Sequence, residues 1–338
     1  MSQSSDELIK REIVDKVGPV RSDLQLRVFP SGSNKDQDLF SQGGLTFGVD
    51  GVSYGSCDAA WCVSENWIDK NNMTAYAVRP VIALEGTNAL NTGSSGNAQY
   101  QRFHHALGAV RNGIVGVYYL RRGTKKIRPE LHAMSVAASS IEGTPYIVTD
   151  DLELVKNLAS NFDKEELFKK TANEAIKKSR LIFDDYFNKR FGNWNTFAKK
   201  RSTVLINDTA IKHAGRMKRN FTDGSQRAGH IAVGEMYLTK FLFPKYKVDY
   251  LWPRMNREDL VDLDSRKSTD KEWALLRTEP NVRIVTRDDV QGLEKSFKND
   301  LYQMRDEPLK GTAMSAYSHI AMIIQTGLEN GKYAIELD

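Results

Sequence analysis

Two acidic side chains lie where expected strands end, and together they could bind a divalent cation. Asp58 lies in the segment GSCDAAW at the end of one expected strand, and Glu85 follows the apolar run PVIAL of the next long strand. Carboxylate oxygens suit Mg²⁺, and a bound Mg²⁺ can lower the pKa of water and neutralise charge on a phosphodiester. We therefore expect a metal site at one edge of a sheet. The alternative is that Asp58 caps a bulge and Glu85 pairs with a surface arginine.

The elements that must position these acids alternate between strand and helix. After a short amphipathic helix over 5–17, the segment LTFGVDGVSYGSCDAAWCV predicts a β-hairpin with its turn near Asp50 and Gly51. Downstream, the pattern predicts strand, helix, strand, helix, strand and helix in that order. The ranges are 75–86, 97–113, 114–123, 129–143, 144–151 and 152–162. This order is typical of an α/β sheet flanked by helices.

The rest of the chain predicts a second region that is mostly helical. Residues 163–240 are expected to be helical and basic. Two strands, 247–255 and 281–290, around a charged helix over 256–279 predict a smaller α/β element. A final helix is expected over 311–328.

Positive charge is concentrated in this second region. Between residues 175 and 230 there are thirteen basic and four acidic side chains, a local excess of +9 against +5 for the whole chain. Such a block favours a polyanionic partner such as nucleic acid. The alternative is a solvated helix face.

Polar side chains in two loops add candidate contacts to DNA. The loop GSSGN (93–97) precedes a helix, where backbone N–H groups could bind a phosphate. It is not a Walker A loop, because no Lys-Ser/Thr follows its glycine, and the alternative is an ordinary helix cap. The candidate DNA contacts are Ser94, Ser95, Arg102, Lys199, Lys200, Arg201, Arg216, Lys218, Arg219, Ser225, Gln226 and Arg227.

The arrangement of acids and elements over residues 44–160 resembles the PD-(D/E)XK nuclease superfamily, the fold of most type II restriction endonucleases. In that family a hairpin strand carries an Asp, the next strand carries a Glu, and a helix and a further strand follow. Asp58 and Glu85 match the two acids. The resemblance implies a restriction-endonuclease-like mixed sheet, with 1–172 as the catalytic domain, 173–338 as the DNA-recognition region, and Mg²⁺ as cofactor.

The sequence departs from the family pattern at two positions. Cys57 stands where Pro is usual, and Thr87 stands where the family has a lysine that helps to orient the attacking water. Gln99 is our preferred substitute, because it lies in the first turns of the helix after the acidic strand. Other candidates for that role are Arg102, Lys125 and Lys126. Glu65 and Glu12 are candidate further metal ligands.

These observations favour a Mg²⁺-dependent, sequence-specific endonuclease that cleaves double-stranded DNA. Symmetric DNA sites favour a two-fold homodimer. The alternatives are a DNA-binding protein without catalysis and, third, an α/β enzyme that binds a phosphorylated ligand at GSSGN. We expect the two cysteines to be buried on opposite faces of one strand. These cysteines, together with a polar N-terminus and the absence of a long apolar run, predict a cytoplasmic protein with no membrane contact.

Overall fold

The computed structural model describes most of the first half of the chain and short segments of the second. The described residues are 5–29, 45–49, 52–68, 75–91, 96–191, 233–234, 237–238, 241, 248–252 and 282–286. The chain divides into two compact units, Met1–Phe183 and Asp184–Asp338. The boundary expected after residue 172 lies inside a long helix, α5 (Glu165–Phe191).

A mixed five-stranded sheet forms the centre of the first unit. Its strand order is β1-β4-β7-β8-β9. The strands are β1 (Gln25–Val28), β4 (Ala59–Val63), β7 (Arg79–Thr87), β8 (Val115–Leu120) and β9 (Tyr146–Thr149). β1 and β4 are antiparallel to their neighbours, whereas β7, β8 and β9 run parallel. This confirms the expected α/β class with a mixed sheet.

β7 is the middle strand of the sheet because almost all of its side chains are apolar. Its sequence RPVIALEGT is buried from Pro80 to Thr87, as expected of a strand with neighbours on both sides and helices on both faces. Glu85 is thereby placed in the interior, opposite Tyr118 of β8. A carboxylate at this position requires partners from the covering helices.

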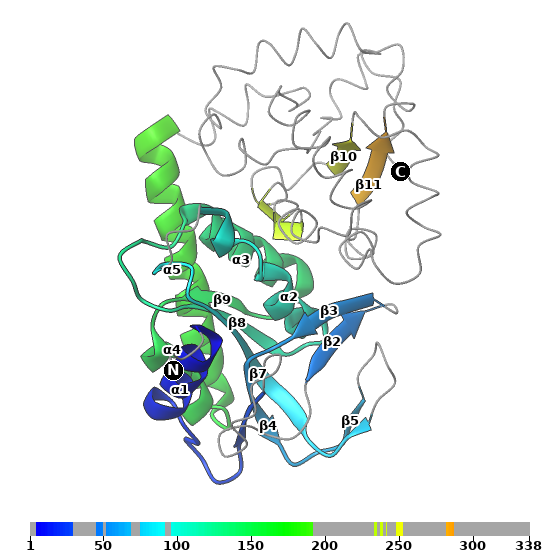
Figure 1. Ribbon diagram of the computed structural model, residues 1–338, viewed down its shortest axis with the longest axis vertical. Helices are drawn as coiled ribbons and strands as arrows, with labels where there is room; N and C mark the ends of the chain where they lie inside the picture. The colour runs from blue at the N-terminus through cyan, green and yellow to red at the C-terminus, as the bar shows by residue number, and fades with distance from the viewer. Residues whose placement is uncertain are drawn as a thin grey trace, which may run out of the picture. The chain divides into compact units, whose positions relative to one another are not determined.

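Helices cover both faces of the sheet (Figure 1). On one face, α1 (Ser5–Lys16), α4 (Leu152–Ser160) and part of α5 contribute to an apolar cluster with strand residues such as Trp61 and Val117. On the other face lie α2 (Phe103–Arg111) and α3 (Pro129–Glu142). The helix expected over 97–113 is divided into a 3-10 turn, η1 (Gly96–Gln99), and α2. At this break, the Tyr118 hydroxyl donates a hydrogen bond to the Gln99 carbonyl.

Two small hairpins accompany the sheet. β2 (Thr46–Val49) pairs with β3 (Val52–Ser56), which confirms the hairpin expected around Asp50 and Gly51. β5 (Trp67–Ile68) pairs with β6 (Ala75–Tyr76). Asp58 does not end a strand as expected. It lies directly before β4, and its backbone N–H donates to the Leu84 carbonyl of β7 at 2.9 Å.

The two cysteines lie on the same side of the sheet, so the expectation of opposite faces is wrong. Cys57 and Cys62 both join an apolar cluster with Phe47 and Ala60. The reason is that Cys57 precedes β4 and does not follow its alternation, in which Ala60 and Cys62 pack on one face and Ala59 and Trp61 on the other. Both thiols are buried and free, and burial raises the pKa of Cys62 to about 12.

In the second unit, the structure describes one pair of parallel strands. β10 (Val248–Trp252) pairs with β11 (Val282–Thr286), as the sequence predicts. The helices expected over 256–279 and 311–328 lie outside the described residues. Among the helices that the structure describes, none combines the length and apolar character of a membrane span.

Candidate functional site

Asp58 is a buried carboxylate held from three directions. Its Oδ2 accepts a hydrogen bond from the Gly86 N–H at 2.8 Å, and its Oδ1 lies 3.2 Å from Lys10 Nζ. Its backbone carbonyl accepts from the Phe29 N–H, just beyond β1. Strand β7, the end of β1 and helix α1 therefore fix its position together.

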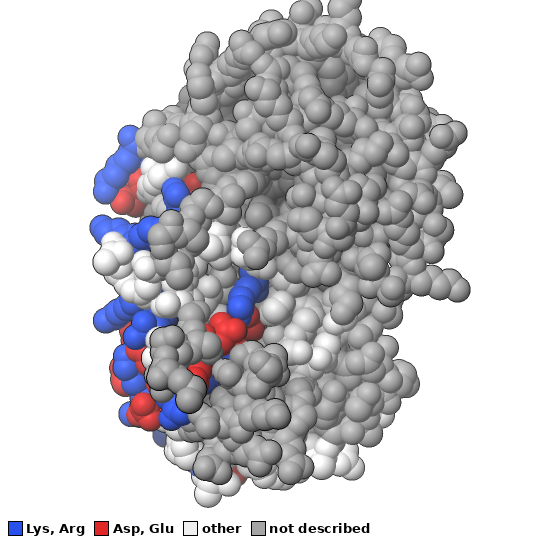
Figure 2. All heavy atoms as spheres, viewed as in Figure 1, with Lys and Arg blue, Asp and Glu red and all other residues white. Residues whose placement is uncertain are grey.

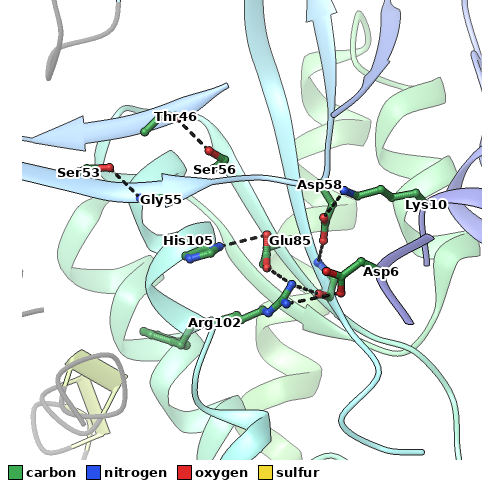
Figure 3. Close-up of polar contacts among 12 residues, drawn as sticks. Asp6, Lys10, Thr46, Ser53, Gly55, Ser56, Asp58, Glu85, Arg102 and His105 are labelled. Carbon is green, nitrogen blue, oxygen red and sulfur yellow. Dashed lines mark hydrogen bonds and ion pairs between the residues drawn. The ribbon is translucent and has the colours of Figure 1, made fainter. Parts of the chain in front are cut away.

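Glu85 is a second buried carboxylate at the same end of the sheet, two residues before the end of β7. Its Oε1 lies 3.0 Å from Arg102 Nη1, and its Oε2 lies 3.2 Å from His105 Nδ1. Arg102 also lies 3.5 Å from Asp6 of α1. Figure 3 shows Arg102 and His105 reaching Glu85, and Asp6 of α1 reaching Arg102. Asp58 and Glu85, predicted to share one sheet edge, both lie at the carboxyl end of β7.

Sequence reasoning missed two members of this cluster, Lys10 and Asp6. Together with Ile9 and Ile13 they occupy positions i, i+3, i+4 and i+7 of one helical face. Ile9 and Ile13 are fully buried, and Lys10 is only 2% exposed. A lysine inside the apolar stripe of a helix is rarely buried without a partner. The position of Lys10 beside Ile9 and Ile13 was therefore the sequence signal that α1 brings a positive charge to a buried acid.

Helix α1 approaches the site closely because residue 86 is a glycine. A Cβ atom at Gly86 would lie 2.4 Å from Cγ2 of Ile9, inside any permitted contact. The absence of a side chain next to Glu85 therefore lets Ile9 pack over the strand end. This close packing brings Lys10 to Asp58.

The two carboxylates interact electrostatically. Burial raises the pKa of Asp58, and the charge of Glu85 raises it further. Lys10, the Gly86 N–H and Arg102 oppose this rise, and the resulting pKa of Asp58 is about 7. The pKa of Arg102 is also raised: burial disfavours its cation, but the charges of Glu85 and Asp6 outweigh that effect. The cluster thus holds one buried acid, Asp58, whose ionisation is disfavoured by burial and by the charge of Glu85.

Asp58 and Glu85 are the residues that could hold a Mg²⁺ ion. Mg²⁺ is commonly bound by one or two carboxylates and keeps several waters, so the pair fits this cation with water and substrate oxygens as further ligands. Within the described ranges, no group of three or more His, Cys, Asp or Glu side chains is arranged for a metal ion. The carboxylate oxygens instead meet Lys10, Arg102 and His105. A metal would therefore exchange with one of these side chains.

The two candidate further acids have other partners. Glu65 pairs with Arg79 at 2.8 Å. Arg79 begins β7, so at about 3.3 Å per residue this pair lies roughly 20 Å from Glu85, and Glu65 does not join the site. Glu12 accepts a hydrogen bond from Arg121 Nε at 3.0 Å. Glu12 lies on α1, and this hydrogen bond joins it to Arg121, the residue that follows β8.

The candidates for the missing lysine lie in different places. Arg102 reaches Glu85, as described above. Gln99 is buried, and its amide accepts from the Arg128 N–H at 2.9 Å and donates to the Lys126 carbonyl at 3.2 Å. Both polar atoms of its side chain therefore hold the loop after β8, and its role beside the acids stays a prediction. Lys125 and Lys126, on that same loop, line a separate cavity.

Of the candidate DNA contacts, Arg102 lies in the described part of the chain. Ser94, Ser95, Lys199, Lys200, Arg201, Arg216, Lys218, Arg219, Ser225, Gln226 and Arg227 lie outside the described residues. On the face shown in Figure 2, the described Lys and Arg side chains are intermixed with Asp and Glu. The positive block expected from the sequence therefore stays a prediction.

Comparisons with known proteins add no identity to this picture. No protein-family model, no curated protein and no solved structure matches the chain. The fold and the buried carboxylate pair are therefore the guide to its function.

Proposed function

We propose that the protein is a Mg²⁺-dependent endonuclease that hydrolyses phosphodiester bonds of double-stranded DNA at specific sequences, in the manner of type II restriction enzymes. The observation that carries the proposal is the buried pair Asp58 and Glu85 at the carboxyl end of the central strand of a mixed sheet. Burying Asp58 beside a second carboxylate that raises its pKa is unfavourable for folding. Groups perturbed in this way are concentrated at functional sites.

The side chains around the acids suit a phosphodiester substrate. When bound at Asp58 and Glu85, Mg²⁺ would supply an activated water and offset charge on the phosphate. Arg102 pairs with buried Glu85 while its side chain remains 36% exposed, so its guanidinium can also meet a phosphate oxygen. Lys10, at Asp58, provides a cation beside the acids although Thr87 stands at the family's lysine position.

The proposal gives the second region the task of recognition. Its basic block suits the DNA backbone, and residues 173–338 would read the sequence. Because a two-fold symmetric site presents the same surface twice, the active form is proposed to be a homodimer.

One observation favours a second candidate, a DNA-binding protein without catalysis. The oxygens of both carboxylates already have neighbours: Lys10 and the Gly86 N–H at Asp58, and Arg102 and His105 at Glu85. Such a network can be purely structural. The two candidates differ in whether the acids are needed for cleavage or only for folding.

Cleavage assays with matched variants separate the two. The purified chain is incubated with phage and plasmid DNA and Mg²⁺, beside Asp58→Asn, Glu85→Gln and the control Glu65→Gln, with thermal melts to confirm folding. We expect discrete fragments from the wild type and Glu65→Gln, and at least about 100-fold slower cleavage by the other two. Undiminished cleavage by folded Asp58→Asn would contradict the proposal. Tight DNA binding by a wild type that never cleaves would favour the second candidate.

A further inference from the structure

A cavity of about 970 Å³ lies within the first unit and includes none of the residues around Asp58 and Glu85. It opens at the end of β9, beside the loop that follows β8 and between α4 and α5. The carboxyl ends of parallel strands are where open α/β sheets bind ligands. The volume falls in the range of small-molecule sites.

One side of this cavity carries basic side chains on a loop held in place. Lys125 and Lys126 line it from the loop, and Lys178 lines it from α5. The Lys125 N–H donates to the Leu90 carbonyl at 3.1 Å. The buried amide of Gln99 donates to the Lys126 carbonyl and accepts from the Arg128 N–H. The loop backbone is therefore ordered before any ligand arrives, which lowers the cost of binding.

The same loop is fixed at its other end by Asn91. The Asn91 Nδ2 donates to the Arg122 carbonyl at 2.9 Å. A Cβ atom on Gly123 would lie 2.5 Å from Asn91 Oδ1 and 2.6 Å from the Leu90 carbonyl oxygen. Only glycine fits there, so the path of the loop is specified by close contact.

The lining of the cavity also offers apolar surface and neutral hydrogen-bonding groups. Leu154, Ala175 and Ile182 line it. His132 and Ser179 line it too, and Nδ1 of His132 lies 3.0 Å from Oγ of Ser179. Burial lowers the pKa of His132 to about 4, so at neutral pH the ring is uncharged and acts through hydrogen bonds.

Two of the three acidic residues that line the cavity have partners. Asp150 lies 3.5 Å from Arg122. Asp151 accepts from the Glu153 N–H at 3.0 Å and so caps α4. Glu174 is the remaining acid of the lining. Lys126 of the loop and Lys178 of α5 are the basic lining residues that we assign to an anionic group.

We propose that this cavity binds a nucleotide, with the base against Leu154, Ala175 and Ile182 and the phosphate at Lys126 and Lys178. An apolar wall, neutral hydrogen-bonding groups and a basic rim are the three surfaces that base, sugar and phosphate require. The nucleotide could come from solution or be unstacked from a nucleic acid strand. The site does not depend on the proposed cleavage.

Binding to the full chain is measured by calorimetry in EDTA, so that no cleavage occurs. The probes are the four common nucleoside monophosphates, a short single strand and inorganic phosphate. The test variant is Lys178→Glu, and the matched control is Lys177→Glu, one residue away on the same exposed helix but outside the lining. Ala175→Phe, which places a ring on the apolar part of the lining, is a second test, and thermal melts check that each variant folds.

We expect a monophosphate or the strand to bind more tightly than inorganic phosphate. Lys178→Glu should weaken that binding roughly tenfold or more, and Lys177→Glu less than about twofold. Binding of free monophosphates would identify a soluble ligand. Binding of the strand alone, with the same dependence on Lys178, would identify an unstacked nucleotide. The proposal is overturned if neither binds, if inorganic phosphate binds as tightly, or if the two lysine variants behave alike.

Discussion

The two ends of β7 carry ion pairs of similar chemistry in opposite environments. At the amino end, Arg79 meets Glu65 with side chains 40% and 58% exposed. At the carboxyl end, Glu85 and Asp58 each meet a cation, and their side chains are 2% and 7% exposed. An exposed pair contributes about 0–1 kcal/mol, whereas removing charges from water costs several kcal/mol per ion. The carboxyl end thus keeps charge that stability does not require, as expected of a functional site.

The origin of this difference is helix α1. It lies over the carboxyl end of β7, where Ile9 packs on Gly86 and Lys10 reaches Asp58. The amino end carries a pair that remains open to solvent. Variants at the two ends of β7 can therefore separate the effect of burial from the effect of ion pairing on stability.

The largest expected effect comes from removing the buried cation. Lys10→Met leaves the Asp58 charge without that partner, and we expect a loss of about 3–5 kcal/mol in the free energy of unfolding at pH 8. Adding Asp58→Asn to Lys10→Met should recover most of this loss, because a neutral pair needs no compensation. Urea unfolding measures both. The control Arg79→Met at the exposed end should cost less than about 1 kcal/mol; equal costs at the two ends would remove the contrast.

A smaller effect is expected in the pH dependence of stability. The pKa of Asp58 is about 7 in the folded protein, against an ordinary value of 3.8. Between these values the folded state holds a proton that the unfolded state has lost. Stability should therefore fall as the pH rises from about 4 to 7, by at most about 4 kcal/mol.

Unfolding measured across this range in two variants checks the assignment. Asp58→Asn should lose this part of the pH dependence, because the titrating group is gone. Glu65→Gln, at the exposed end of β7, should keep it. A wild-type stability that rises with pH over the same window would show that Asp58 ionises as an ordinary carboxyl.

The sequence was sufficient for the order of the elements but not for the partners of the acids. The run RPVIALEGT predicts a buried central strand because its side chains are apolar on both faces, and the structure confirms β7 as the middle strand. Each helix between β7 and α4 carries local signals, such as Pro129 at the start of α3. Local pattern was enough wherever neighbours in sequence decide the structure.

Contacts made across the fold escaped prediction. Whether Lys10 meets Asp58 depends on how α1 crosses the sheet, and a glycine at residue 86 permits that crossing. Gln99 appeared well placed because it follows the acidic strand, yet its amide turns to the loop after β8. The sequence carried the residues for both contacts, but their pairing depends on tertiary packing, which periodicity does not encode.

The smallest effect concerns the close packing that separates the two ends of β7. Gly86→Ala places a Cβ atom against Ile9, and we expect a loss of about 1–3 kcal/mol from overpacking. Because the clash is with one side chain, Ile9→Ala should be less destabilising in the Gly86→Ala background than in the wild type, and a double-mutant cycle measures that coupling. If α1 shifts to relieve the clash, Lys10 withdraws from Asp58 and the pH dependence changes as well. If the losses in stability from the two substitutions were strictly additive, the contact between Ile9 and Gly86 would not be what positions α1 beside the acids, and another contact would have that role.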